Sequence, residues 1–289
     1  MPLFLDTNHN VRSGWKFALY VAVFVASWYL TGLLFVLIYE KTSIPEGVLT
    51  ILWLNILARF LAAVMATLFM AGFVDHLPLS AFGISLHSRW IRDLGSGLVI
   101  AGGMLLLLLL GSAIFGNLQM EWAAGNNSLA SLAGTAGILV VAAASEEVLF
   151  RGYPLQALMK GLGTWPAVIV MSCVFGLLHA LNPDSSVLGV ANTIIAGLML
   201  SLAYMKTRSL WFPYGIHVGW NLGLGVVAGF PLSGLSTASL WTAHISGSPA
   251  ILGGAYGPEG GALGTLIFIA GAAAARGIPS QNLEARKRP

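Results

Sequence analysis

Two adjacent glutamates lie inside an apolar segment of the chain, in the stretch AAASEEVLFRGYP at residues 142–154. Arg151 follows Glu147 by four residues, which places both side chains on one helix face in the favourable order for an ion pair. Glu146 points about 100° away from Glu147, so Arg151 can hardly serve both acids. A charge inside a membrane helix costs roughly 3 kcal/mol unless it is paired or faces water. Glu146 is therefore an unpaired acid and a candidate for function.

Two further polar pairs lie in later apolar segments. Phe175 and His179 are four residues apart, and so are His217 and Asn221, so each pair shares one face of its helix. A histidine in a membrane helix more often bonds two helices together than takes part in catalysis. The depth of these residues therefore decides between the two interpretations.

The turn GLGT at residues 161–164 predicts a helical hairpin, because glycine readily ends a helix. Glu146 and His179 lie at nearly equal sequence distances from this turn, on either side, so we expect them to face each other at one depth. Arg151 then lies below the membrane surface. The helix that contains it must be long, or bent near Pro154.

These residue types fit the hydrolysis of an amide bond. That reaction needs a base to activate water and donors that stabilise the developing oxyanion. Glu146 with His179 could hold and deprotonate the water. His217 and Asn221 could donate hydrogen bonds to the oxyanion. The same residue types also fit a zinc site of Glu146, His179 and His217, so a zinc mechanism stays open on residue types.

Functions of other classes are less well supported. The sequence contains no His-Glu-x-x-His or Gly-x-Ser-x-Gly motif, and Cys173 suits a small buried residue better than a nucleophile. A proton-coupled transporter is an alternative, in which Glu147, Arg151 and the histidines would relay protons, but we find no internal repeat of the transporter kind. A non-catalytic membrane scaffold, which would keep these polar residues for packing, is a further alternative.

The composition indicates what fold must position these residues. The chain has 289 residues, of which 57% are hydrophobic and only 9% charged, whereas about a quarter of a soluble domain is charged. We therefore predict an all-α fold, a polytopic membrane helix bundle of about eight transmembrane helices in a single domain over residues 1–289. The predicted spans cover about residues 14–38, 48–72, 94–115, 130–158, 165–181, 187–205, 209–229 and 261–276.

The loops predict the orientation of this bundle. With eight spans, the loops on one side contain most of the lysines and arginines, and those on the other contain only Lys41. The positive-inside rule then makes both termini cytoplasmic, with a basic cytoplasmic tail at residues 277–289. We expect an integral protein of a bacterial plasma membrane, without a nucleic-acid partner; the sequence indicates no oligomeric state.

The sequence also contains a glycine repeat and, at residues 230–260, a segment between the last two predicted spans. Gly215, Gly219 and Gly223 form a small-residue stripe that permits close helix packing. The segment 230–260 is expected to be an outer loop without a functional motif. Its His244 and Glu259 are expected to be polar loop residues outside the site.

Taken together, the three motifs resemble the CPBP family of intramembrane endopeptidases, which includes the type II CAAX prenyl proteases and bacterial bacteriocin-processing, Abi-like proteins. The resemblance covers residues 130–225, the core that contains the motifs. The motifs are, in chain order, Glu146-Glu147-x-x-x-Arg151, Phe175-x-x-x-His179 and His217-x-x-x-Asn221.

The resemblance implies roles for these residues. Glu146 and His179 would activate the catalytic water, and the pair of Glu147 and Arg151 would support the site. His217 and Asn221 would form the oxyanion site. The family mechanism implied is a metal-independent glutamate one, without a cofactor. The substrate would be a peptide or membrane protein within the bilayer, with or without a lipid attached; eukaryotic members remove the last three residues of a prenylated Cys-a-a-X protein.

Overall fold

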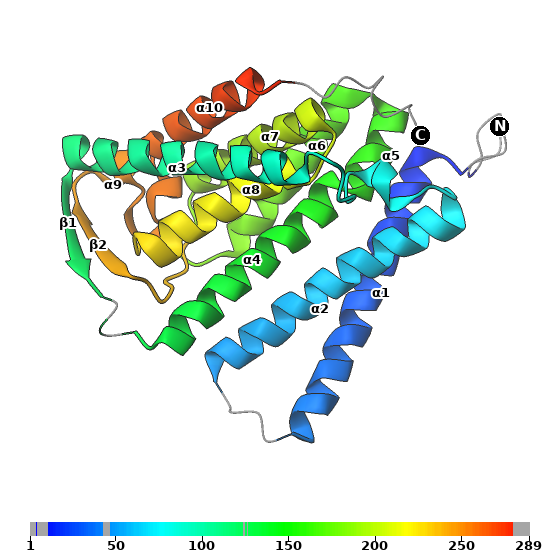
Figure 1. The fold of residues 1–289 in the computed structure, drawn as a ribbon, viewed down its shortest axis with the longest axis horizontal. Coiled ribbons are helices and arrows are strands. Elements are labelled where there is room, and N and C mark those ends of the chain that lie inside the picture. Colours follow the sequence, from blue (N-terminus) through cyan, green and yellow to red (C-terminus); the bar gives the residue numbers. More distant parts are fainter. Residues whose placement is uncertain (1–3, 5–10, 43–46, 124, 126, 280–289) are drawn as a thin grey trace.

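The computed structural model describes residues 4, 11–42, 47–123, 125 and 127–279 (Figure 1). Most of this chain is helical, and the predicted all-α membrane bundle is confirmed. The larger helices are α1 (Ser13–Glu40), α2 (Val48–Phe69), α3 (Trp90–Phe115), α4 (Leu129–Arg151), α5 (Tyr153–Leu162), α6 (Thr164–Leu178), α7 (Val187–Thr207), α8 (Trp211–Asn221) and α10 (Ala262–Gly277).

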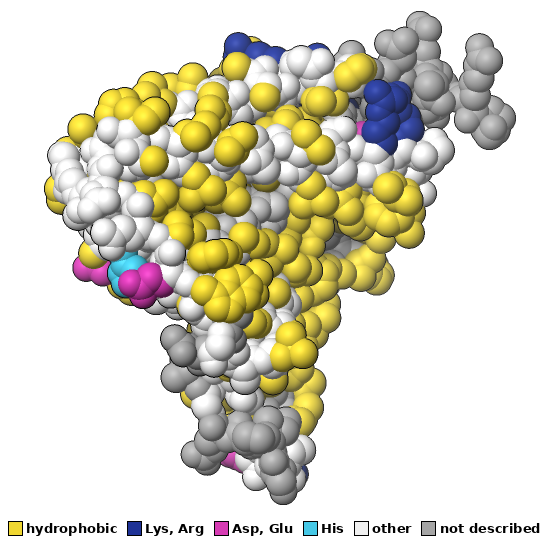
Figure 2. Space-filling model, turned by 60° about the vertical axis from the view of Figure 1, so that its left-hand side comes forward, with side chains coloured by type: hydrophobic (Ala, Val, Ile, Leu, Met, Phe, Trp, Pro, Cys, Tyr) yellow, Lys and Arg dark blue, Asp and Glu magenta, His cyan; other side chains and the backbone are white. Residues whose placement is uncertain are grey.

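Six helical segments are long and apolar enough to cross a membrane, as judged by length and composition. The predicted number of eight is not confirmed. Helix α8 ends at Asn221 and continues as a π-helix over Leu222–Val227, and α10 has only 16 residues. Figure 2 shows hydrophobic side chains over much of one face, as expected where lipid replaces water. Of the predicted basic tail, residues 280–289 lie outside the described part of the chain.

Helix α4 lies between two groups of helices (Figure 1). The pair α1 and α2 packs on one side of it, while α8 packs on the other, backed by α3, α7 and α10. Helix α4 therefore has neighbours from both groups. A site on α4 can include residues from the N-terminal pair of helices as well as from the core.

The expected helical hairpin is confirmed, including its bend. Helix α4 ends at Arg151, Gly152 interrupts it, and α5 begins at Tyr153 with Pro154 in its first turn. Proline fits there because the first helical turn has no internal partner for its missing N–H. Gly163, with φ +85°, then reverses the chain into α6, a conformation that costs glycine little.

The glycine stripe of α8 packs against α3. A Cβ on Gly215 would overlap the carbonyl oxygen of Leu94, and one on Gly219 would lie 2.8 Å from the Cβ of Ala101. On the facing helix, a Cβ on Gly97 would collide with the backbone of α8. This close contact, as predicted, holds α8 by one face and leaves the opposite face for the polar pair.

One part of the fold was not predicted. Strand β1 (Asn117–Trp122) pairs antiparallel with β2 (Trp241–Ser246), in a register that sets Asn117 opposite Ser246. The expectation that the segment 230–260 is only a loop is therefore wrong. Because the two strands are about 120 residues apart in the chain, local patterns alone do not reveal their pairing. The segment also contains α9 (Pro249–Leu252) and two short 3₁₀ turns.

Candidate functional site

Glu147 connects α4 to α8 through one carboxylate oxygen. Its Oε1 accepts a hydrogen bond from Nη1 of Arg151 at 2.9 Å, and Nδ1 of His217 lies 2.7 Å from the same atom. Arg151 also donates from Nη2 to the carbonyl of Gly197 on α7, and its guanidinium lies 4.7 Å from the centre of the Phe175 ring. The predicted pairing of Glu147 with Arg151 is confirmed, and both side chains are almost fully buried.

His217 lies between the two adjacent glutamates. An ionised carboxylate only accepts hydrogen bonds, so Nδ1 of His217 carries the hydrogen that is directed at Glu147. The other ring nitrogen, Nε2, then lies 3.6 Å from Oε2 of Glu146, which is too far for a direct hydrogen bond. Glu147 thus fixes the ring, and Nε2 faces the side of α4 on which Glu146 lies.

Glu146 has a partner that the sequence did not suggest. Its Oε1 accepts a hydrogen bond from Nη2 of Arg59 on α2, at 3.1 Å. The expectation of an unpaired Glu146 is therefore wrong. The cost of a charge in hydrocarbon, the argument that singled out Glu146, applies equally to an arginine in the apolar run 48–72. That cost was the sequence signal that could have identified Arg59.

His179 lies where α6 ends and a 3₁₀ turn over His179–Leu181 begins. Its Nδ1 lies 2.8 Å from the carbonyl oxygen of Phe175, and the two rings are 4.7 Å apart between centres. Because a carbonyl oxygen only accepts, Nδ1 carries the hydrogen here too. In this tautomer Nε2 of His179 is the nitrogen that can accept a proton.

A cavity of about 670 Å³ brings the predicted residues together. Its polar lining includes the four predicted catalytic side chains, and Asn221 lies one turn beyond His217 on the same face of α8. Apolar side chains from α1 and α2, among them Phe24 and Ile56, form another wall. The predicted catalytic residues on this cavity are Glu146, His179, His217 and Asn221.

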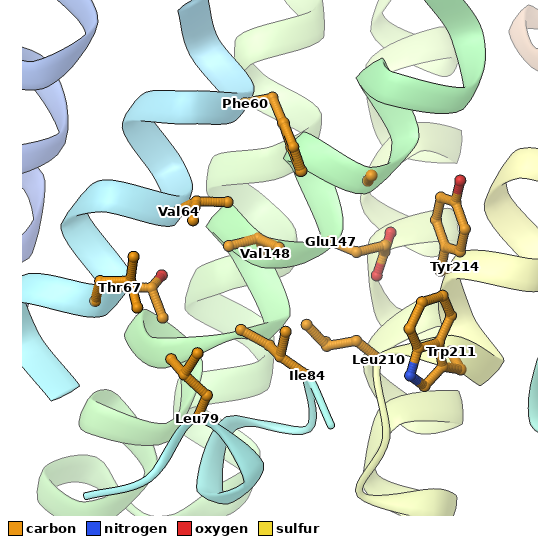
Figure 3. A pocket seen from close by; sticks show the side chains of 12 residues that line it. Phe60, Val64, Thr67, Leu79, Ile84, Glu147, Val148, Leu210, Trp211 and Tyr214 are labelled. Carbon is orange, nitrogen blue, oxygen red and sulfur yellow. The ribbon is translucent and has the colours of Figure 1, made fainter. Parts of the chain in front are cut away.

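Glu147 lies on the other side of α4 from this cavity. It lines a separate, mainly apolar cavity of about 240 Å³, where its carboxylate points toward Trp211 and Tyr214 (Figure 3). Its second oxygen, Oε2, is buried and has no hydrogen-bond partner among the described residues. The two adjacent glutamates therefore occupy different environments, as their helical positions predict.

Glu259 also lines the larger cavity, so the expectation that it lies outside the site is wrong. It is buried, and Oε1 accepts a hydrogen bond from Nε1 of Trp220 at 2.8 Å. Its Oε2 accepts from both the backbone N–H and the hydroxyl of Ser233, at 2.7 and 2.6 Å. Glu259 therefore ties the segment after α8 to the neighbour of Asn221. His244, by contrast, lies exposed on β2, 3.5 Å from Glu121.

The arrangement of possible metal ligands differs from that of a metal site. In the described part of the chain, no three His, Cys, Asp or Glu side chains are grouped so that they could hold a metal ion. Of the residues in the alternative zinc site, Glu146 is paired with Arg59, and His217 turns one nitrogen to Glu147. The cavity is thus lined by one acid with an arginine partner, two histidines and an amide.

The fold and the cavity together define the class of the protein: it is an integral membrane protein with a polar site inside its helix bundle. The comparison with known families specifies the class further: residues 128–223 match the family model described as type II CAAX prenyl endopeptidase Rce1-like. This match is consistent with the CPBP family, which confirms the resemblance predicted from the motifs. At the level of the family, this match supports a CAAX-type intramembrane peptidase. A comparison with curated proteins found no match.

Proposed function

We propose that the protein is a glutamate-type intramembrane endopeptidase. Glu146 and His179 hold a water molecule and remove its proton as it attacks the carbonyl carbon of a peptide bond. The observation that supports this role most directly is the shared cavity, because an acid, two histidines and an amide from three parts of the chain line one space. A base and an oxyanion site must converge in this way for amide hydrolysis.

The oxyanion site is assigned to His217 and Asn221. Nε2 of His217 and the side-chain amide of Asn221 lie one helical turn apart on the cavity face of α8, where both can donate to one oxygen. Donation by Nε2 requires a protonated ring, because Nδ1 already carries a hydrogen. The carboxylate of Glu147 stabilises that cation through its contact with Nδ1.

Arg151 and Phe175 support the site from behind. Arg151 neutralises Glu147 and anchors it to α7, while the ring of Phe175 packs against both Arg151 and His179. Neither side chain needs to touch the substrate for this role. They keep Glu147 and His179 in fixed positions, which matters because catalysis depends on placement within fractions of an ångström.

The test uses purified protein in lipid nanodiscs with membrane-inserted peptides and an S-prenylated Cys-a-a-X peptide, with products identified by mass spectrometry. We expect Glu146→Gln to lower the rate by about 10²- to 10⁴-fold, the usual contribution of a general base. Asn221→Ala should cost about 10²- to 10³-fold, as for other oxyanion donors. Glu121→Gln is the matched control, because this acid is exposed on β1, and full activity is expected. Unchanged cleavage by Glu146→Gln would refute the proposal.

A chelator separates the glutamate mechanism from its zinc alternative. If Glu146, His179 and His217 bind zinc, prolonged dialysis against a chelator should abolish cleavage, and added zinc should restore it. We propose the metal-independent reaction, for which cleavage is unaffected. The pairing of Glu146 with Arg59 supports this choice, because the arginine supplies the positive charge that a metal would otherwise bring to the carboxylate.

We also propose the setting in which the reaction occurs. The substrate is a peptide or membrane protein that enters from the bilayer, with or without an attached lipid, and the apolar wall from α1 and α2 suits such a partner. The protein would lie in a bacterial plasma membrane with both termini cytoplasmic. Reporter fusions at each terminus test that orientation.

A further inference from the structure

We propose that Arg59 binds a carboxylate of the peptide substrate close to the scissile bond, and so selects the substrate. This inference rests on the proposed endopeptidase activity. Arg59 lies on α2, outside the segment that matches the family model. Among the described residues that line the larger cavity, it is the only lysine or arginine. Any anionic group that enters this cavity therefore meets Arg59, the one always-charged cation among the described residues of its wall.

Arg59 has donors that Glu146 does not use. A guanidinium has five N–H donors, and the described chain gives Arg59 one hydrogen bond, from Nη2 to Oε1 of Glu146. Its Nε is buried and has no partner. Nε of Arg151 also lacks a partner, but Arg151 donates to two partners and is 1% exposed, whereas Arg59 donates to one and its side chain is 24% exposed. A purely structural pair would be expected to resemble the sealed pair of Arg151.

The chemistry of these donors selects the kind of ligand. The planar fork of a guanidinium matches the two oxygens of a carboxylate, and such a pair is strong in an apolar cavity. Two groups of a peptide offer this chemistry: the C-terminal carboxylate and the side chain of Asp or Glu. Both would be drawn to Arg59, and substrate design can distinguish them.

The short distance between Arg59 and Glu146 places this carboxylate near the reacting bond. Arg59 lies 3.1 Å from Oε1 of Glu146, and a water held by Glu146 lies about 3 Å from the carboxylate. A substrate carboxylate bonded to the same nitrogen, Nη2, is therefore at most about 9 Å from the attacking oxygen, adding one hydrogen bond of about 3 Å. Extended chain covers about 3.5 Å per residue. The recognised group belongs to one of the first three residues after the scissile bond.

Binding of this carboxylate would also affect Glu146. An arginine that turns its donors to the substrate leaves Oε1 of Glu146 free to accept a hydrogen bond from the attacking water. Substrate selection and activation of the water would then be linked through one side chain. A peptide without the carboxylate would leave Glu146 held by Arg59.

The experiment compares matched peptides built on one cleaved sequence. One peptide has a free C-terminal carboxylate three residues after the scissile bond, one has a C-terminal amide, and three are amides with Asp at the first, second or third position. We expect the wild-type protein to prefer at least one carboxylate peptide over the plain amide by tenfold or more in kcat/KM. Whether the C-terminal or an Asp peptide is preferred identifies the source of the carboxylate.

Variants of Arg59 test the role of the residue itself. Arg59→Ala should reduce the preference for the carboxylate peptide to about onefold, because neither peptide then meets a cationic partner, and Arg59→Lys should retain part of the preference. Equal cleavage of all peptides by the wild type overturns the inference, as does an equal loss on all peptides in Arg59→Ala, since Arg59 would then act only as the partner of Glu146. If Arg59→Ala does not fold, the test uses the ratio of kcat/KM for the carboxylate peptide to that for the amide peptide, compared between the wild type and Arg59→Lys. A wild type that cleaves no peptide overturns the proposed function instead, and this inference with it.

Discussion

Replacing Glu147 by glutamine tests the division of roles between the two adjacent glutamates. The substitution keeps the shape of the side chain and one acceptor oxygen but removes the charge. Arg151, 1% exposed, then has a carbonyl and an amide oxygen as partners in place of a carboxylate. Removing one charge of a buried ion pair costs about 3–5 kcal/mol. Because the amide oxygen can still accept from Arg151, we expect the lower end, about 3 kcal/mol.

The same substitution should lower activity for a separate reason. Glu147 fixes the tautomer of His217 by accepting from Nδ1. A neutral amide does not stabilise the protonated ring of His217 as a carboxylate does, so the developing oxyanion meets a neutral donor in place of a cation. In the Ser-His-Asp triad, where the histidine is the general base rather than an oxyanion donor, the corresponding carboxylate-to-amide change costs about 10⁴-fold in rate, which is an upper limit for His217. For Glu147→Gln we expect a loss of about 10²- to 10⁴-fold.

A double variant separates these two effects. Glu147→Gln with Arg151→Met removes both charges, and a buried pair replaced by neutral groups is often close to neutral in stability. We expect the double variant to recover at least about 2 kcal/mol of the lost stability while its activity stays low. Stability is measured by denaturation in mixed micelles and activity in nanodiscs. If activity returns with stability, Glu147 serves only as the counter-ion of Arg151, and the reasoning about His217 is refuted.

Three further predictions concern the surroundings of the site. Burial alone would raise the pKa of Asp75, but its ion pair with Lys16 outweighs this and lowers the pKa. The ion pair therefore stabilises the fold above the ordinary pKa of about 3.9, and this stability is lost as the pH falls through the lower pKa of the folded protein. Asp75→Asn should thus flatten the fall in thermal midpoint measured below about pH 4. Gly215→Val should separate α3 from α8 and lower both the unfolding midpoint and activity, whereas Gly14→Ala, with nothing within 4 Å, should change neither. Glu259→Gln should weaken its hydrogen bonds to the segment after α8, so we expect a loss of about 1–3 kcal/mol in mixed-micelle denaturation; wild-type stability would contradict the anchoring role.

The parts of the site that follow from local spacing could be predicted from the sequence. Glu147 and Arg151 are four residues apart on one helix, so their pairing depends only on helical geometry. The bend at Gly152 and the chain reversal at Gly163 follow from glycine and proline, whose backbone preferences act within a few residues. The glycine stripe on α8 likewise depends on a helical repeat, and it identifies a packing face without identifying its partner.

Contacts between distant segments could not be predicted in this way. The pairing of Arg59 with Glu146 joins residues 87 apart in the chain, and nothing near either residue specifies which helix will lie beside it. The burial of Glu259 similarly depends on Trp220 and Ser233, which lie 39 and 26 residues away. Local patterns can show that a charge inside the bundle needs a partner, but only the packing of the helices determines which residue that is.

The position of His217 explains why two adjacent acids are useful at this point of α4. Neighbouring positions on a helix face different directions, so Glu147 can be buried against Arg151 while Glu146 faces the cavity. His217 on α8 contacts Glu147 through Nδ1 and approaches Glu146 with Nε2, so one ring faces both acids. A single glutamate could not orient the histidine and also act as the base beside it. In the proposed reaction, the second acid therefore has a chemical role that an apolar residue at position 147 could not supply.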